Sequence, residues 1–291
     1  MIRAWHFTRG LADRMGAAHL GLIAAGVAFY AMLGIFPGLA AVIAIWGLVA
    51  DPHVIASYLD VAREFIPPEA FAILTAQIDT LLEAPRQGLG WATAVSVAIA
   101  LYSARAGVAG LVEGIDILHD TRPRHGIAAF ILGQVLTLAL VGVMLVALAV
   151  VVVVPLVLAF LPMAGVQALM LKALPWVAML ALMLTALGIL YRYGPNTPDR
   201  TERWFSTGAV VACLGWAGAS LAFSYYLGNF GAYNRIYGSL GAVIALLMWL
   251  YLSVWVVLAG AAVNAQIAAR ARAPDRDQPP APPQPRAGIT P

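Results

Sequence analysis

One arginine interrupts a long apolar stretch in the first half of this 291-residue chain. Arg105 is the only charged residue between Gly88 and Leu111, and Glu113 and Asp116 follow on the same helical face, eight and eleven positions later. A guanidinium in such a segment either extends to the membrane interface and pairs with an acid of another helix, or it contacts an anion such as a lipid headgroup. The paired role is the more common of the two. We therefore regard Arg105 as a candidate residue of a substrate pathway.

A second group of polar side chains lies in segment 229–239, which reads NFGAYNRIYGS. Its amides, phenols and glycine backbone can bind a polar headgroup, or they can satisfy the backbone groups of a tight turn between helices, which is the commoner use. An asparagine near the inner end of the last apolar run is also a candidate, although an amide there commonly joins helices. The candidates besides Arg105 are thus Asn229, Tyr233, Asn234, Tyr237, Ser239 and Asn264.

The sequence contains no residue pattern typical of an enzyme. The five histidines lie far apart, at positions 6, 19, 53, 119 and 125, and none forms a pair spaced like a metal site. The single cysteine, Cys213, excludes an internal disulfide. No phosphate-binding glycine motif with Lys and no G-x-S-x-G motif occurs. The sequence therefore predicts no metal, no other cofactor and no enzymatic activity.

The elements that must position these candidates are transmembrane helices. Charged residues make up 11% of the chain and hydrophobic residues 62%, whereas soluble domains contain roughly 25% and 45 to 50%. About 20 apolar residues cross a bilayer. The long apolar runs predict an all-α, polytopic transmembrane helical bundle of about six spans, at 15–50, 88–111, 127–161, 173–191, 204–228 and 236–269. Within the first span, Pro37 predicts a helix kink.

Three segments outside the spans complete the predicted organisation. Residues 1–19 predict a cytoplasmic amphipathic helix at the membrane surface, before a transmembrane domain at 20–269. The acidic segment 51–87 predicts an amphipathic helical hairpin outside the cytoplasm. The helix of the second span is expected to continue through Glu113, Asp116 and Asp120 into water. The Pro-rich segment 270–291 predicts a disordered cytoplasmic tail.

The distribution of basic residues predicts the orientation. One set of alternate loops and termini contains 13 Lys and Arg residues, and the other set contains 4. The positive-inside rule therefore places both termini in the cytoplasm. Because these residues lie near helix ends rather than in one patch, we expect membrane lipids as partners and no nucleic acid. The sequence leaves open whether the chain forms a homo-oligomer, because small-residue pairs such as Gly34 and Gly38 also occur in ordinary helix packing.

Several short stretches resemble the YihY/BrkB family of bacterial inner-membrane proteins, once labelled ribonuclease BN. They are AAGVAFY at 24–30 followed by Phe36-Pro37, LYSARA at 101–106, YRYGPN at 191–196, and the continuous segment 223–264. The resemblance covers about residues 21–266. It implies a multi-pass protein of the bacterial inner membrane, and it implies no catalytic residues, because the family is associated with virulence, nuclease activity and lipid transport alike.

Two classes of function are compatible with these features. The first is a transporter or translocase of a lipid-like or amphipathic substrate, because so few charges lie in the spans. The second is a non-catalytic membrane scaffold that maintains the cell envelope. A lipid-modifying enzyme is disfavoured by the missing site. Ribonuclease activity is disfavoured because its chemistry usually needs a metal held by acids or histidines, or an acid and base pair.

Overall fold

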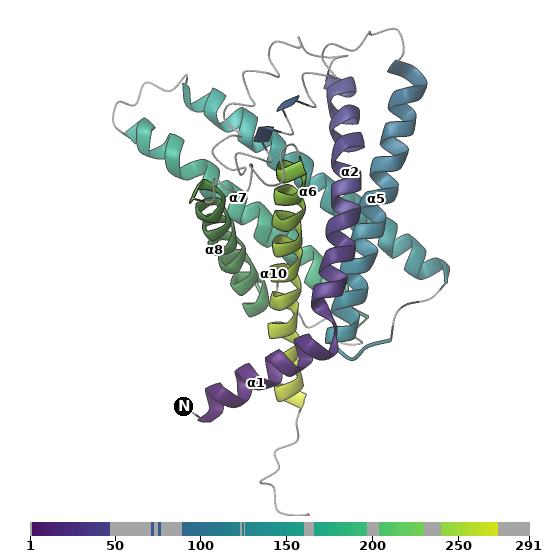
Figure 1. Ribbon diagram of the computed structural model, residues 1–291, viewed down its shortest axis with the longest axis vertical. Helices are drawn as coiled ribbons and strands as arrows, with labels where there is room; N and C mark the ends of the chain where they lie inside the picture. Colours follow the sequence, from purple (N-terminus) through teal and green to yellow (C-terminus); the bar gives the residue numbers. More distant parts are fainter. Residues whose placement is uncertain are drawn as a thin grey trace, which may run out of the picture.

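The computed structural model describes residues 2–46, 71–72, 75–76, 89–122, 124, 126–159, 166–196, 204–229 and 240–272. The regular elements in this part of the chain are α-helices, which confirms the predicted all-α class. They are α1 (Ile2–Ala17), α2 (Leu20–Trp46), α5 (Leu89–Leu118), α6 (Ile127–Ala159), α7 (Val166–Tyr193), α8 (Thr207–Asn229) and α10 (Leu240–Arg272). Figure 1 shows α2, α5 and α10 side by side, with α6 and α7 inclined to them. Most of the predicted hairpin at 51–87 lies outside the described residues.

Five of the described helices are long and apolar enough to cross a membrane. Their spanning segments are Leu20–Gly38, Thr93–Leu118, Ile127–Ala147, Thr207–Leu227 and Gly241–Ala271. The apolar stretch of α7, Val177–Tyr193, is shorter. Its direction is nevertheless fixed, because Arg124, before α6, donates a hydrogen bond to the carbonyl of Gly194, after α7. Helices α6 and α7 therefore run antiparallel beside each other, with the start of α6 next to the end of α7.

Two predicted boundaries are corrected by the structure. Helix α7 begins at Val166 rather than at residue 173. Helix α6 passes Pro155 and ends at Ala159, close to the predicted end at residue 161. A proline removes one helical hydrogen bond but is tolerated in membrane helices, where neighbouring groups replace that bond. Helix α10 extends to Arg272, into the predicted tail. Near the end of α10, the guanidinium carbon of Arg270 lies 4.7 Å from the centroid of the Phe7 ring of α1.

Close packing between α2 and α5 depends on small residues. A Cβ atom added at Gly34 would lie 3.1 Å from the Cβ of Ser103, and one added at Gly110 would lie 2.8 Å from a methyl group of Val27. A Cβ on Gly38 would reach Ala100 at 4.0 Å. Glycine at these positions lets the two backbones approach one another, as the small-residue spacing predicts.

Helix α1 packs against the bundle rather than only lying on a membrane surface. Its apolar side chains Leu11 and Met15 join the main buried cluster, together with Ala18 just beyond the helix. The chain turns between α1 and α2 at His19, which has a φ of 48°. Figure 1 shows α1 crossing the lower end of α10. The amphipathic pattern of residues 1–19 thus serves contacts within the protein.

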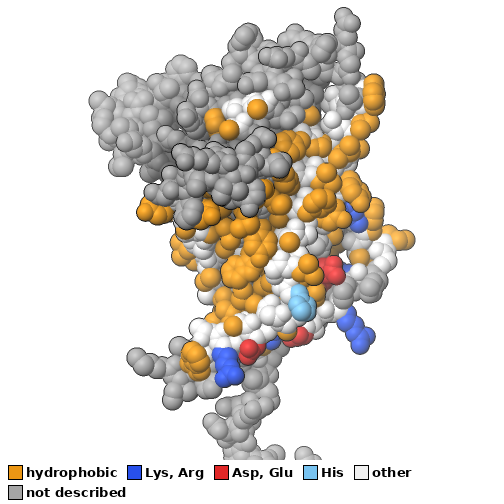
Figure 2. All heavy atoms as spheres, viewed as in Figure 1, with side chains coloured by type: hydrophobic (Ala, Val, Ile, Leu, Met, Phe, Trp, Pro, Cys, Tyr) orange, Lys and Arg blue, Asp and Glu red, His pale blue; other side chains and the backbone are white. Residues whose placement is uncertain are grey.

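Large apolar side chains cover much of the described surface. Leu22 is 77% exposed and Met144 is 70% exposed. Figure 2 shows a broad apolar surface, with most of the described charged side chains gathered below it. This distribution is the one expected of a chain whose surroundings are lipid, with water at the charged end.

Candidate functional site

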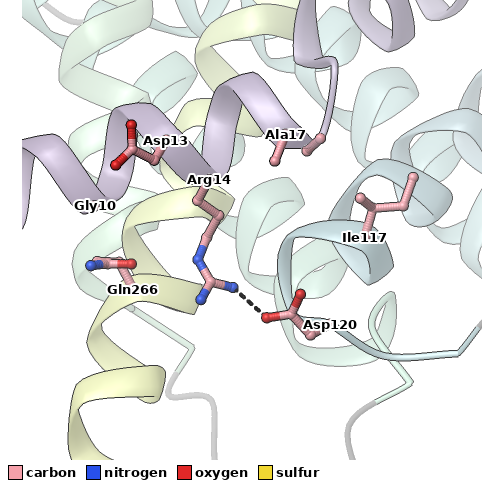
Figure 3. A pocket seen from close by; sticks show the side chains of 8 residues that line it. Gly10, Asp13, Arg14, Ala17, Ile117, Asp120 and Gln266 are labelled. Carbon is pink, nitrogen blue, oxygen red and sulfur yellow. Dashed lines mark hydrogen bonds and ion pairs between the residues drawn. The ribbon is translucent and has the colours of Figure 1, made fainter.

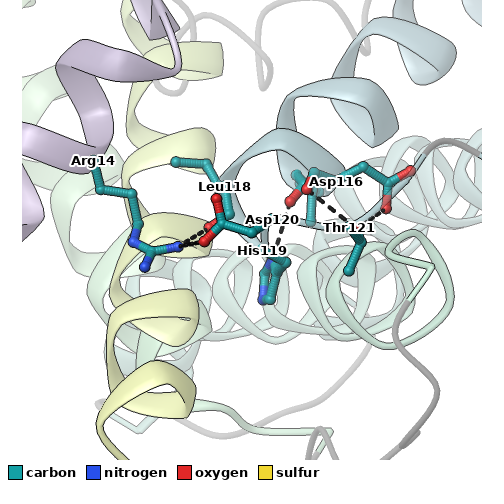
Figure 4. Close-up of polar contacts among 7 residues, drawn as sticks. Arg14, Asp116, Leu118, His119, Asp120 and Thr121 are labelled. Atoms are coloured by element: carbon teal, nitrogen blue, oxygen red, sulfur yellow. Dashed lines mark hydrogen bonds and ion pairs between the residues drawn. The ribbon is translucent and has the colours of Figure 1, made fainter. Parts of the chain in front are cut away.

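The described polar contacts concentrate where α5 ends and α7 ends. Asp116 is only 2% exposed. Its Oδ1 accepts hydrogen bonds from the backbone N–H of Asn196, at 2.7 Å, and from the hydroxyl of Thr121, at 2.9 Å. Figure 4 shows Asp116 and Thr121 beside each other at the end of α5. The expectation that Asp116 lies in water is therefore wrong, because the chain after α7 covers it.

Arg124, just before α6, also bonds to the end of α7. Its guanidinium donates to the carbonyl oxygens of Gly194 and Pro195, each at 2.8 Å, and to that of Tyr193 at 3.4 Å. The last carbonyls of a helix have no helical N–H partner, and a cation near them also interacts favourably with the helix dipole. Arg124 therefore caps α7. The YGPN turn at 193–196 thus contacts both Asp116 at the end of α5 and Arg124 before α6.

A third contact joins α1 to the end of α5. The Nη1 atom of Arg14 lies 2.9 Å from a carboxylate oxygen of Asp120 and also donates to the carbonyl of Leu118. Helix α5 ends at Leu118, and Asp120 has a φ of 55°, so the expected continuation of the helix through Asp120 is wrong. The ion pair lies beside an open hollow of about 540 Å³, which Gln266 of α10 also lines. Figure 3 shows Arg14, Asp120 and Gln266 at this hollow.

Asn264 joins α10 to the start of α8. Its Oδ1 accepts from the N–H of Gly208 at 2.7 Å, and its Nδ2 donates to the hydroxyl of Ser206 at 2.8 Å. Ser206 in turn accepts from the N–H of Ala209, as a helix N-cap does. Asn264 is 5% exposed, so both ends of its amide are used in a buried contact between helices.

Arg105 lies apart from these contacts, between α5 and α6. Its Nη1 donates to the carbonyl of Phe130 at 3.3 Å, and its guanidinium carbon lies 4.3 Å from the centroid of the Phe130 ring. The side chain is partly exposed. The described residues include no carboxylate within ion-pair distance of it. The expected pairing with an acid of another helix is not seen in this part of the chain, and a carbonyl and a ring take that place.

The structure places the remaining candidates as follows. Asn229 is the last residue of α8, and Pro37 lies inside α2, nine residues before its end at Trp46. Four candidates, Tyr233, Asn234, Tyr237 and Ser239, lie outside the described residues. Arg105 and Asn264 are on different helices and share no described contact, so the structure does not bring these two candidates together.

Three residues with central roles in the polar contacts were missed as candidates. Ser206 was recognisable, since a serine shortly before an apolar run is a typical N-cap. Asp116 and Arg124 gave no such signal, because their partners lie about 70 to 80 positions later in the chain. Among the described residues, no group of three or more His, Cys, Asp or Glu side chains could hold a metal ion.

Comparison with known proteins places these features in a family. The pattern of the virulence factor BrkB family matches residues 11–285. The chain is 27% identical over 258 residues to the ribonuclease-like protein YfkH of Bacillus subtilis, covering 87% of this chain and 92% of YfkH.

Shorter matches connect the chain to proteins named UPF0761 membrane proteins. It is 39% identical over 82 residues to one from Verminephrobacter eiseniae, which covers 28% of this chain and 19% of that relative. It is also 39% identical over 79 residues to one from Tolumonas auensis, covering 27% and 26%. These matches span only about a fifth to a quarter of those two relatives. No solved structure matches the chain.

Proposed function

The chain belongs to the virulence factor BrkB family, whose relatives include membrane proteins, and on this premise we propose that it moves lipid-like, amphipathic molecules across the bacterial inner membrane. Membrane lipids are then both its surroundings and its substrates. The observation that carries the proposal is the position of Arg105.

Arg105 combines a location inside a span with unused hydrogen-bonding capacity. It lies in the spanning segment Thr93–Leu118, eight residues before Glu113, or about 12 Å along a straight helix. One of its guanidinium nitrogens bonds to Phe130, and no described residue takes a hydrogen bond from the other two. Guanidinium groups bind phosphate through two parallel hydrogen bonds, and hydrocarbon cannot solvate such a charge. An anionic headgroup is the ligand that suits these donors.

The surface around Arg105 supports a lipid rather than a water-soluble ligand. Tyr102 is 65% exposed, Phe130 is 58% exposed and Ile131 is 55% exposed. Gly133 adds to the fit, because a Cβ atom there would lie 3.2 Å from the guanidinium of Arg105. A headgroup at Arg105 would therefore have apolar surface beside it on α5 and α6, where acyl chains can lie.

A scaffold remains the second candidate function, and the contacts at the charged end favour it. There, Asp116, Arg124 and Asn264 form hydrogen bonds within the chain itself. These bonds hold the helix ends in fixed positions, and they leave the three side chains little capacity to bind a substrate. We also propose that the chain is not an enzyme. The ribonuclease-like name belongs to YfkH.

Reconstituted vesicles test the translocase proposal. Fluorescently labelled phospholipids are placed in both leaflets, and dithionite then reports how fast inner-leaflet lipids reach the outside. Removing a charge-assisted hydrogen bond costs about 1.5 to 3 kcal/mol, so Arg105→Gln should slow movement by roughly tenfold or more. The matched control is Arg122→Gln, which removes the same charge from an exposed side chain.

Both variants must first elute as folded protein in size-exclusion chromatography. A parent protein that moves no lipid of an anionic and zwitterionic panel would overturn the proposal and favour the scaffold. So would an Arg105→Gln variant, folded and reconstituted at the same density, that moves lipid at the parent rate. Asn234→Ala extends the test to segment 229–239.

A further inference from the structure

Ser103 is a buried hydroxyl that the fold leaves without a described partner. Its side chain is 0% exposed, and its Oγ makes no hydrogen bond to any described residue. It lies where α5 packs on α2, since a Cβ atom at Gly34 would lie 3.1 Å from the Cβ of Ser103. A buried hydroxyl without a partner is costly, and in native proteins such a group usually meets a water molecule or another polar group.

The facing turn of α2 contains a backbone carbonyl that its own helix cannot satisfy. Pro37 lies inside α2 and has no N–H, so the carbonyl of Leu33, four residues earlier, lacks its helical donor. Gly34 follows Leu33 directly and contacts Ser103, while Gly38 faces Ala100. The turn of α2 from 34 to 38 therefore runs along the turn of α5 from 103 to 100. The carbonyl without a helical donor belongs to the residue directly before Gly34, one position from the contact that holds the unpartnered hydroxyl.

We infer that a water molecule binds between the hydroxyl of Ser103 and the carbonyl of Leu33. The water donates one hydrogen to the Leu33 carbonyl and accepts the hydroxyl hydrogen of Ser103. Proline in a membrane helix is tolerated where a serine, a water or a neighbouring helix replaces the lost bond, and such positions are the usual places of bends. The site makes the Pro37 turn a hydrated hinge between α2 and α5. It does not depend on the lipid proposal, because Arg105 contacts α6 instead.

A double-mutant cycle in the full-length protein tests this inference. Ser103→Ala, Pro37→Ala and the double variant are unfolded reversibly in mixed detergent micelles. With Pro37 present, Ser103→Ala should lower the folded-to-unfolded ratio by about fivefold to tenfold, because the water loses a partner. In the Pro37→Ala background, the new N–H bonds to Leu33, and the same change should alter the ratio by less than about twofold. Such coupling is the signature of groups that share one ligand.

The matched control is Thr185→Ala, which removes a hydroxyl on α7 that donates to the carbonyl of Ala181 at 2.8 Å. Its effect should be the same in both backgrounds. An equal effect of Ser103→Ala in both backgrounds would overturn the inference, as would a gain in stability from Ser103→Ala, which indicates a dry, unpaired hydroxyl. If Pro37→Ala fails to fold, a map of the parent that resolves ordered water decides instead. A peak within hydrogen-bond distance of both atoms supports the site, and a dry contact refutes it.

Discussion

Replacing Asn264 by alanine should destabilise the bundle strongly, because the side chain serves two groups of α8 at once. The change removes the bond from the Gly208 N–H and the bond to the Ser206 hydroxyl. Hydrogen bonds between membrane helices contribute about 0.6 kcal/mol each on average, and a buried N–H without a partner costs about 1 to 3 kcal/mol. Since Gly208 is buried, we expect a loss of about 2 to 4 kcal/mol.

Asn264→Asp separates the two bonds. The carboxylate still accepts from Gly208 but cannot donate to Ser206. It also lies at the N-terminus of α8, where the helix dipole favours a negative charge. We therefore expect a smaller loss, about 1 kcal/mol, and hence the order parent, Asn264→Asp, Asn264→Ala in decreasing stability.

The assay is reversible unfolding of the purified protein in maltoside micelles titrated with dodecyl sulfate, followed by circular dichroism. The control is Gln266→Ala, two residues later on α10, because Gln266 is only partly buried and lines the open hollow. It should change stability by less than about 0.5 kcal/mol. If Asn264→Ala costs no more than Gln266→Ala, the two bonds do not stabilise the contact between α8 and α10, and the reasoning is refuted.

Three further predictions concern topology, the end of α5 and the absence of nuclease activity. In a Cys213→Ala background, an impermeant thiol reagent should label Cys placed at Asp79 from outside and Cys placed at Arg122 from inside; labelling of both from one side would contradict the orientation. Asp116→Ala should cost about 2 kcal/mol, because the N–H of Asn196 loses its acceptor, while the Thr121 hydroxyl keeps the backbone carbonyl of residue 116; unchanged unfolding would show that this buried contact is dispensable. Rigorously purified protein should not cleave RNA with added divalent metals, and cleavage abolished by a substitution in this chain would disprove that expectation.

The helices were predictable from the sequence because each depends on a local property. Uncharged runs longer than a bilayer needs can only be satisfied by helices in lipid, and Gly194-Pro195 marks the end of α7 as a turn. The shorter apolar stretch of α7 shows the limit of this approach, since it was predicted as a span but its apolar part is only Val177–Tyr193, and its antiparallel course beside α6 follows from the contact between Arg124 and Gly194.

The candidate site was less predictable, because burial of a polar group is decided by chain segments far away in the sequence. Asp116 follows a span and precedes charged residues, a pattern typical of a solvated helix end, yet Asn196 covers it. Arg105 was recognisable as unusual, but its contact with a carbonyl and the ring of Phe130 was not, since any acid in the chain was an equally reasonable partner beforehand.

The contact between Gly208 and Gly260 has a consequence for how the chain can vary. A Cβ atom at Gly208 would overlap the carbonyl oxygen of Gly260 in the neighbouring helix. Every other amino acid carries a Cβ atom, so every missense change at residue 208 creates a steric clash that forces α8 and α10 apart. A Cβ atom at Gly218, ten residues further along α8, would meet nothing within 4 Å, and neither would one at Gly142 of α6. Alanine there should be accepted and should favour the helix by up to about 1 kcal/mol, so the tolerance of a glycine codon in this protein depends on which helix faces it.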